Sequence, residues 1–168
     1  MLENKLNHDA SDALKAAFRR HASGVAVITT RSPEGAPVGF TATSMTSLGS
    51  NPALVTFNVA RGSSSWPTLS VATHLALHML GGGNVELARK MAADHTKRFL
   101  DNDWKESEFG LPVFQEVTAV LFVKVREFHA IEQNAVFITE VVSGLMGSED
   151  AALLYNQRSY FTPADTAL

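Results

Sequence analysis

GFTATSMTS (residues 39–47) and NVARGSSSWP (residues 58–67) are the two stretches that decide the fold. Each begins with residues typical of a β-strand and ends in small side chains, several of which carry hydroxyl groups. Hydroxyls beside open backbone N–H groups bind anions such as phosphate. Serine and threonine are also common in polar loops and as helix N-caps. The hydroxyls alone therefore support a phosphate site and a pair of capped loops about equally.

The overall composition is that of one globular domain. The chain has 168 residues, 45% of them hydrophobic, and a formal net charge of -3. That charge argues against nucleic acid as the main partner, which would require a basic face. No apolar run is long enough to span a membrane, and the polar first twelve residues lack the pattern of a signal peptide. We expect one cytoplasmic domain over residues 1–168, loose at 1–10 and 162–168.

The chain contains no cysteine, so disulfides, thiolate metal sites and cysteine nucleophiles are excluded. A histidine pair is the remaining metal candidate. His74 and His78 lie on a predicted strand, where four residues span about 13 Å, too far for one metal ion to bridge. The sequence therefore predicts no metal site.

Strand patterns dominate the chain, and the strands follow one another in hairpins. Residues 43–49 are expected to leave the sheet as a loop. Hairpins favour an antiparallel sheet, and closure into a barrel would remove its edges. The predicted fold class is mainly β, an antiparallel barrel with a few flanking helices. The strands are expected at residues 25–30, 37–42, 53–59, 74–80, 117–131 and 135–146.

Helical periodicity is confined to short parts of the chain. A helix capped by Ser11 is expected to end near His21, with Leu14 and Phe18 on one apolar face. Asn84 is expected to cap a second helix that ends near residue 95. A third, short helix can begin at residues 63–65, and Pro67 is tolerated in its first turn.

The long polar segment 99–112 contains two large aromatic residues, Trp104 and Phe109. Both rings need cover, and a second subunit is one source of it. Before this segment, Gly81–Gly83 lacks the GxGxxG spacing of a dinucleotide site and is interpreted as a turn. Ser63–Ser65 lack the G-x-S-x-G elbow of a serine nucleophile. The sequence predicts no catalytic side chain.

A basic pair, Lys97 and Arg98, followed by Phe99, comes after the helix predicted at 84–95. Positive side chains at a helix C-terminus are stabilised by the helix dipole without any ligand. The alternative is a second phosphate contact from the basic pair, or a ring-edge contact from Phe99. The sequence leaves both interpretations open.

Several stretches together resemble the short-chain flavin reductases, the small flavin-reducing partners of two-component aromatic monooxygenases. They are HASGVAVITT (21–30), GFTATSMTSL (39–48) and NPALVTFNVARGSSSWPTL (51–69). The match continues through HLALHML, ELARKMA and KRF into the last hairpin, so it covers roughly residues 11–161. The combination of TATS and NVARGSSSW at this separation is specific, whereas either motif alone would be weak.

The resemblance implies a split β-barrel that works as a homodimer and binds FMN or FAD near the dimer interface. It implies hydride transfer from C4 of NADH or NADPH to N5 of the flavin, supplying a separate monooxygenase. A flavin-binding carrier or sensor without efficient turnover is the first alternative. A β-barrel that binds a protein partner and no flavin is the second.

The resemblance also implies a set of cofactor-binding residues with distinct roles. The strand before the first stretch would flank the flavin ring, the first stretch would line it, and the second would run from the ring to the phosphate. These residues are Val27, Thr29 and Thr30; Thr41, Ala42, Thr43, Ser44 and Met45; Asn58, Val59 and Ala60; Ser64 and Ser65 at the phosphate; and Phe99 near the phosphate end.

One departure from the family pattern concerns the nicotinamide. The family carries Gly-Asp-His in the turn before the last long strand, and this chain has Glu132, Gln133 and Asn134 there. Asn134 falls at the histidine position, where it can donate and accept hydrogen bonds but cannot become cationic. His129 is out of register. Nicotinamide binding at Asn134 is therefore expected to be weak.

Overall fold

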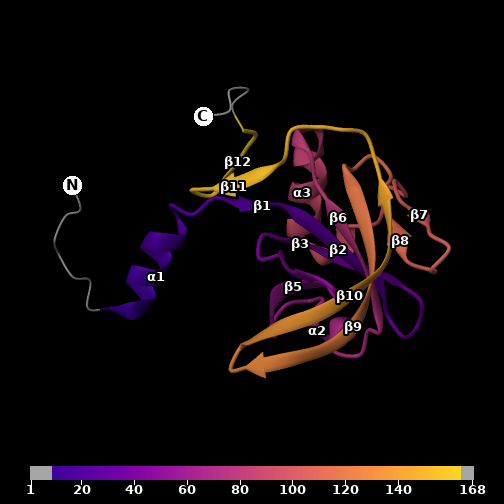
Figure 1. The fold of residues 1–168 in the computed structure, drawn as a ribbon, viewed down its shortest axis with the longest axis horizontal. Coiled ribbons are helices and arrows are strands. Elements are labelled where there is room, and N and C mark those ends of the chain that lie inside the picture. The colour runs from indigo at the N-terminus through magenta and orange to yellow at the C-terminus, as the bar shows by residue number, and fades with distance from the viewer. Residues whose placement is uncertain (1–8, 164–168) are drawn as a thin grey trace.

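The computed structural model describes residues 9–163, which form a strongly curved antiparallel sheet with helices and short strands around it (Figure 1). The predicted loose ends at 1–8 and 164–168 lie outside the described residues. Asp9 and Ala10, which were also expected to be loose, instead cap and begin the first helix. Within residues 9–163, no helix combines the length and apolar character needed to cross a membrane.

The main sheet has seven strands in the order β3-β2-β6-β9-β10-β5-β4, and every neighbouring pair is antiparallel. All six predicted strands are present. The strands are β2 (Ala26–Arg31), β3 (Pro37–Ala42), β4 (Thr46–Ser50), β5 (Ala53–Ala60), β6 (His74–Met79), β9 (Ala119–Ile131) and β10 (Asn134–Met146).

Two small sheets complete the strand content. One has the order β1-β11-β12, and the other pairs β7 with β8. The strands are β1 (Ser23–Gly24), β11 (Leu154–Asn156), β12 (Ser159–Phe161), β7 (Lys105–Glu106) and β8 (Pro112–Val113). β7 and the first residue of β8 lie inside the segment 99–112, which was predicted to be a polar loop.

The prediction of a loop over residues 43–49 is wrong, because β4 starts at Thr46 and pairs with β5. The strand was missed because all five of its residues are exposed and no alternation of apolar and polar residues marks it. A register shift between Ser47 and Gly49 also interrupts the pairing. The sheet therefore gains an edge strand that the pattern did not show.

The helices are shorter than predicted. They are α1 (Ala10–Phe18), α2 (Trp66–Leu69) and α3 (Val85–Ala92), with single turns η1 (Gly82–Asn84) and η2 (His95–Lys97). Asp9 caps α1 in place of the predicted Ser11, because its carboxylate accepts a hydrogen bond from the N–H of Asp12. The Asn84 side chain accepts from the N–H of Gly81 and makes no capping bond to α3.

The sheet packs on both faces. One buried cluster contains residues from both ends of the strand order, so the sheet curves around it; it includes Ile28, Ala42, Val55, Phe57, Leu77 and Phe137. The other lies between the outer face of β2, β6 and β9 and a cover made by α3 and residues 111–117; it includes Val27, Ala76, Met91, Phe114 and Phe122. Successive residues of a strand therefore serve different clusters.

Gly39 allows α3 to pack closely against β3. A Cβ atom built at Gly39 would lie 2.7 Å from Cε of Met91 and 2.8 Å from the carbonyl oxygen of Ile28. Both distances are shorter than ordinary van der Waals contact. A larger residue would therefore clash with the backbone of β2 and would require the Met91 side chain to move.

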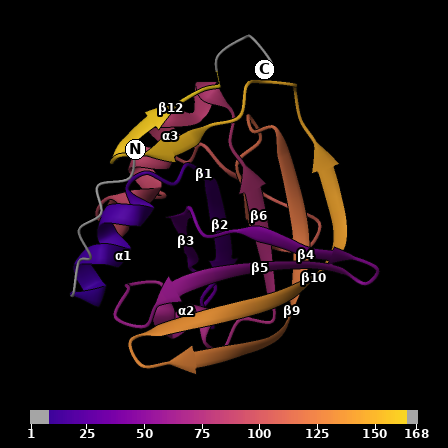
Figure 2. The same ribbon diagram turned by 60° about the vertical axis from the view of Figure 1, so that its left-hand side comes forward.

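The sheet does not close completely into a cylinder, in agreement with the split barrel that the family resemblance implies. Hydrogen bonding runs from β3 at one end of the order to β4 at the other, and both strands are edges. Figure 2 shows β3 and the β4–β5 pair on neighbouring sides of the curved sheet. The mainly β, antiparallel class is confirmed, but the cylinder remains split between its two edge strands.

The two aromatic residues of segment 99–112 find their cover within the chain. Trp104 packs edge-on against Phe99, with the guanidinium of Arg31 over its ring. Phe109 packs against Phe122 with 4.6 Å between ring centroids and stays 40% exposed. These contacts within the chain cover the ring of Trp104 and part of the ring of Phe109.

His78 is a fully buried polar residue in the second cluster. Its Nε2 atom accepts a hydrogen bond from the N–H of Phe114, so the ring proton is on Nδ1, which donates to the carbonyl of Val27. The neutral tautomer thus joins β2, β6 and the segment that covers them. Burial lowers the pKa of His78 from 6.5 to about 4.

This lowered pKa predicts a pH dependence of stability. The unfolded chain takes up a proton at His78 near pH 6.5, and the folded chain does so only near pH 4. The free energy of unfolding should therefore fall as the pH drops from 6.5 to 4, by at most about 1.4 kcal/mol per pH unit from this group. Urea unfolding at several pH values measures it. The His78→Gln variant should be less stable at pH 7 and show a shallower slope; an unchanged slope would contradict the assignment.

Candidate functional site

The structure places the two hydroxyl-bearing stretches side by side. Ser44, between β3 and β4, donates through its hydroxyl to the carbonyl of Asn58 at 3.2 Å and accepts from the N–H of Asn58 at 2.9 Å. One side chain therefore satisfies both backbone groups of a residue on β5. The predicted pairing of the two stretches rests on this double contact across the split of the sheet.

The residues expected to flank a ring on β2 are enclosed. Val27 is buried in the second cluster. The hydroxyl of Thr29 donates to the carbonyl of Pro112, and the hydroxyl of Thr30 donates to the carbonyl of His74. These hydroxyls hold neighbouring segments to β2, so their donor protons are already used inside the protein.

In the first stretch, residues 39–47, some of the predicted site residues are buried and others are exposed. The hydroxyl of Thr41 donates to the carbonyl of Ala88 at 2.6 Å and ties β3 to α3. Ala42 and Met45 pack on the cluster inside the curved sheet. Thr43 is exposed. Of the first stretch's predicted site residues, Thr43 and the half-buried Ser44 are therefore the hydroxyl side chains beside the split.

The second stretch exposes alternate residues of β5. Asn58 and Ala60 are exposed, whereas Val59 points into the cluster inside the sheet. Asn134 is the pairing partner of Ala60 at the start of β10 and is also exposed. The structure therefore brings the predicted nicotinamide residue to the end of the predicted cofactor segment.

Arg61 fixes the turn that precedes Asn134. Its N–H donates to the carbonyl of Gln133 at 2.8 Å, and its Nη1 donates to the carbonyl of Glu132 at 2.7 Å. Its guanidinium also lies over the ring of Trp66. The tip of the β9–β10 hairpin is thus held against the end of β5.

The serine run follows β5 and leads into α2. Ser64 is exposed, while Ser65 is only 2% exposed and occupies the N-cap position without a side-chain capping bond. The hydroxyl oxygen of Ser63 is buried, and within residues 9–163 it has no hydrogen-bond partner. None of the three hydroxyls serves the helix, which removes the interpretation of this run as a simple cap.

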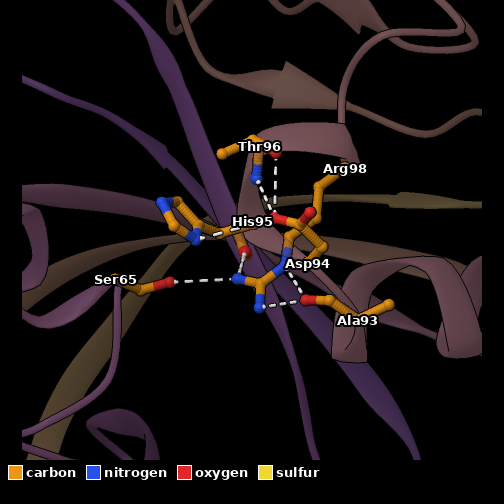
Figure 3. Close-up of polar contacts among 7 residues, drawn as sticks. Ser65, Ala93, Asp94, His95, Thr96 and Arg98 are labelled. Carbon is orange, nitrogen blue, oxygen red and sulfur yellow. Dashed lines mark hydrogen bonds and ion pairs between the residues drawn. The ribbon is translucent and has the colours of Figure 1, made fainter.

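Arg98 reaches this serine run from a distant part of the chain, as Figure 3 shows. Its Nη1 donates to the carbonyl of Gly39 at 2.8 Å and lies 3.5 Å from the hydroxyl of Ser65. Its Nε and Nη2 donate to the carbonyl of Ala93 at 3.2 and 2.8 Å. The side chain thus links β3, the end of α3 and the serine run.

The charge of Arg98 is not paired with a carboxylate among the described contacts. Burial lowers the pKa of its guanidinium, and the charge of nearby Asp94 acts in the opposite direction. The group still remains cationic at neutral pH. The carboxylate of Asp94 instead accepts from the N–H and hydroxyl of Thr96 (Figure 3). A half-buried cation beside serine hydroxyls has the chemistry of an anion site.

The sequence left the role of Lys97, Arg98 and Phe99 open, and the structure separates the three. Phe99 packs with Trp104 and with Phe114 in the cluster under α3. Lys97 is exposed. Of the three, Arg98 alone contacts Ser65. Its Nε and Nη2 also donate to the carbonyl of Ala93, the C-cap residue of α3, so Arg98 meets both the end of the helix and the serine run. Arg98 was not among the cofactor-binding residues predicted from the sequence. Its partner Ser65 lies 33 positions away, so no local pattern links the two residues.

The described residues show no alternative centre for metal chemistry. Residues 9–163 contain no group of three or more His, Asp or Glu side chains placed to hold a metal ion. His74 is exposed beside the hydroxyl of Thr73, and His78 is buried with both ring nitrogens bonded. The two histidines that the sequence paired thus have separate surroundings.

The fold and the site together define a split β-barrel with a serine run and a half-buried arginine beside its open seam. Comparison with known proteins agrees, because the profile of the flavin reductase like domain family matches residues 18–164. The chain belongs to this family. The implied split-barrel fold and the resemblance noted in the sequence are confirmed.

Individual relatives show how much of the chain is shared. The NADH:FMN oxidoreductase of Rhodococcus qingshengii is 37% identical over 155 residues, which cover 89% of this chain and 80% of that protein. The reductase component of a flavin-dependent trigonelline monooxygenase from Acinetobacter baylyi is 30% identical over 92% of this chain, which spans 49% of that protein. A crystal structure of a flavin reductase domain protein from Arthrobacter sp. FB24 superposes with a TM-score of 0.90 at 40% identity, covering 94% of this chain and 98% of that one.

Proposed function

We propose that this protein is a flavin reductase that transfers hydride from NADH or NADPH to FMN or FAD. The observation that carries the proposal is the cation of Arg98 at the hydroxyl of Ser65, beside the split of the sheet. The relatives that match over most of the chain have names that describe the same activity. The proposed domain is the whole chain.

The residues present fit a flavin phosphate. Arg98 supplies a positive charge, Ser64 supplies an exposed hydroxyl, and Ser63 has a buried hydroxyl oxygen without a partner among the described residues. Hydrogen bonds to a charged group are each worth about 1.5–3 kcal/mol. Ser65, whose hydroxyl meets Arg98, completes this group. The predicted phosphate residues therefore stay in the proposal, with Arg98 added.

The remaining predicted residues fall into two groups, those with exposed side chains and those with enclosed side chains. Thr43, Asn58 and Ala60 present surface beside the split and are the residues we assign to the flavin ring and ribityl chain. Val27, Thr29 and Thr30 are assigned to shaping the site from below, since their side chains are enclosed. The same applies to Thr41, Ala42, Val59, Met45 and Phe99, which pack or bond inside the protein.

The bound flavin supplies the hydride-accepting chemistry, so the protein needs no acid–base pair or metal for the transfer. The task of the chain is to hold two ring systems in contact and in the right orientation. Asn134, next to Ala60 and fixed by the turn that Arg61 holds, is assigned to orient the nicotinamide. Its amide hydrogen-bonds without carrying charge.

A homodimer is part of the proposal. Several large apolar side chains are exposed on α1, on β4 and along the β9–β10 hairpin: Leu14, Phe18, Leu48, Ile131, Val142, Leu145 and Met146. Exposed apolar groups of this kind mark interfaces. A separate monooxygenase is the proposed consumer of reduced flavin, supported by the name of the Acinetobacter relative. A cytoplasmic location is also proposed, and the lack of cysteine is compatible with a reducing compartment.

A carrier or sensor that binds flavin without turnover is the second candidate, favoured by Asn134 in place of histidine. Anaerobic bleaching separates the two functions. The purified protein, mixed with FMN or FAD, should lose its yellow colour when NADH or NADPH is added. Colour that persists with every combination would support the carrier, and a protein that binds neither flavin would contradict both.

The phosphate assignment predicts a selective loss of affinity. In the Ser64→Ala/Ser65→Ala variant, FMN should bind at least about tenfold more weakly, because charge-assisted hydrogen bonds are lost. Riboflavin has no phosphate, so its affinity for the variant should equal its affinity for the parent protein. The circular dichroism spectrum should show that the fold is intact. Fluorescence titration measures both ligands. Ser47→Ala, an exposed serine on β4, is the matched control, and equal FMN affinity in all three proteins would overturn the assignment.

The assignment of Asn134 predicts a gain of activity. Asn134→His should raise the reductase rate or lower the KM for the nicotinamide, since it restores the residue that the family carries at this turn. Steady-state kinetics at saturating flavin measure it, with flavin affinity expected to be unchanged. Kinetics identical to those of the parent protein would mean that the turn does not contact the hydride donor.

A further inference from the structure

A basic groove adjoins the proposed flavin site. Of its lining residues, Thr43 is assigned to the flavin and Phe18 to the dimer surface, and the others have no role in the assignments above. It has a volume of about 310 Å³ and runs between α1 and the turn that joins β11 to β12. Its lining includes the cations of Lys15, Arg19 and Arg158 and the rings of Phe18 and Tyr155. Figure 1 shows α1 standing apart from the main sheet, on the side where β1 and β11 lie.

The charge of the groove contrasts with that of the chain. The sequence carries a net charge of -3, yet the described residues that line the groove include three cations and no carboxylate. Lys15 has a partner, Asp12, at 3.7 Å, and both side chains are largely exposed, so this pair neutralises little. Within residues 9–163, neither Arg19 nor Arg158 forms an ion pair with a carboxylate.

The helix dipole explains only part of this cluster. Lys15 and Arg19 are near the C-terminal end of α1, where positive charge is stabilised without a ligand. Arg158 comes from a different element, a tight turn in which Gln157 and Arg158 both have positive φ, 48° and 64°. The N–H of Gln157 donates to the carbonyl of Arg19, which fixes the turn against the end of α1. Cations from two elements are thus held on one groove.

The groove also offers aromatic surface. Phe18 is 64% exposed and packs edge-on against His21, and Tyr155 is half-buried beside Tyr160. Aromatic side chains stack on nucleobases with a gain of about 1–3 kcal/mol per base. Arginine binds phosphate oxygens in a bidentate manner. Aromatic rings together with cations match a ligand that has both a flat base and phosphates.

We propose that this groove binds the adenosine diphosphate moiety of a dinucleotide. The inference rests on the proposed function, because Thr43 lines the groove and is also assigned to the flavin ring, so the groove opens next to the place where the two rings would meet. NADH and FAD both contain adenosine diphosphate, whereas FMN does not. The groove therefore adds affinity for one of these two dinucleotides.

The test uses ADP as the probe and the full-length protein. In the Arg19→Gln/Arg158→Gln variant, the Kd for ADP measured by calorimetry should rise at least about tenfold. Arg20→Gln is the matched control, since Arg20 is exposed next to Arg19 and does not line the groove; its Kd should stay at the parent value. FMN affinity should be the same in all three proteins, so a failed flavin site is distinguished from a failed groove.

Two further measurements distinguish the source of the moiety. If the donor binds here, the double variant raises the KM for NADH with FMN as acceptor and leaves the ratio of FAD to FMN affinity unchanged. If FAD binds here, that ratio falls and the KM for NADH with FMN is unchanged. ADP that fails to bind the parent protein at millimolar concentration, or binds both variants equally, overturns the proposal.

Discussion

The side chain of Arg98 ties together the parts on which the proposed site depends. Its N–H groups bond to carbonyls at Gly39 on β3 and Ala93 after α3, and one of them reaches the hydroxyl of Ser65. A guanidinium can do this because its donors form a rigid planar fork with several directions. Since carbonyls and a hydroxyl, rather than a carboxylate, satisfy these donors, the positive charge remains available to an anion. The same residue therefore stabilises the fold and sets the electrostatics of the site.

The hydroxyl side chains of the predicted site have two separate roles. Those of Thr29, Thr30 and Thr41 donate to carbonyls of Pro112, His74 and Ala88 and so attach the cover of the sheet to its strands. A buried hydroxyl without a partner is costly, and these bonds remove that cost. The hydroxyls beside the split are arranged differently. Ser44 bonds across the split, Thr43 and Ser64 are exposed, and Ser63 is buried without a partner among the described residues. Similar residue types thus build the scaffold in one place and a binding surface in another.

The split itself has a functional consequence. Because β3 and β4 are edges and the sheet is not closed, residues 43–45 lie at a seam. Residues 58–60 pair with β10 on one side and extend beyond the pairing with β4 on the other, so one of their edges also faces this seam. Natural proteins protect exposed sheet edges, for example by covering them with a helix or a loop. The proposed flavin and the proposed second subunit would both cover this seam. The basic groove at Thr43 extends the same surface toward α1, whose apolar residues remain exposed.

The sequence by itself determined the presence of the six longest strands, the hairpins β2–β3 and β9–β10, the buried face of β5 and the family. Alternation over Val55, Phe57 and Val59 is a local signal, and it directly reports which side of a strand is buried. The motif that runs from Asn58 to Ser65 is equally local. The exposed strand β4 and the early end of α3 were not predictable, because an all-exposed strand has no periodic signal and helix ends depend on what they pack against.

Only the tertiary structure decided which candidate residues come together. The contact between Arg98 and Ser65, the enclosure of Thr29 and Thr30, and the joining of Arg158 to α1 link positions far apart in the chain. A residue type at one position carries no information about a partner dozens of residues away until the sheet curves and brings the two segments into contact. The sequence therefore determines which chemical groups are available to the site, and the curved sheet determines which of them lie together.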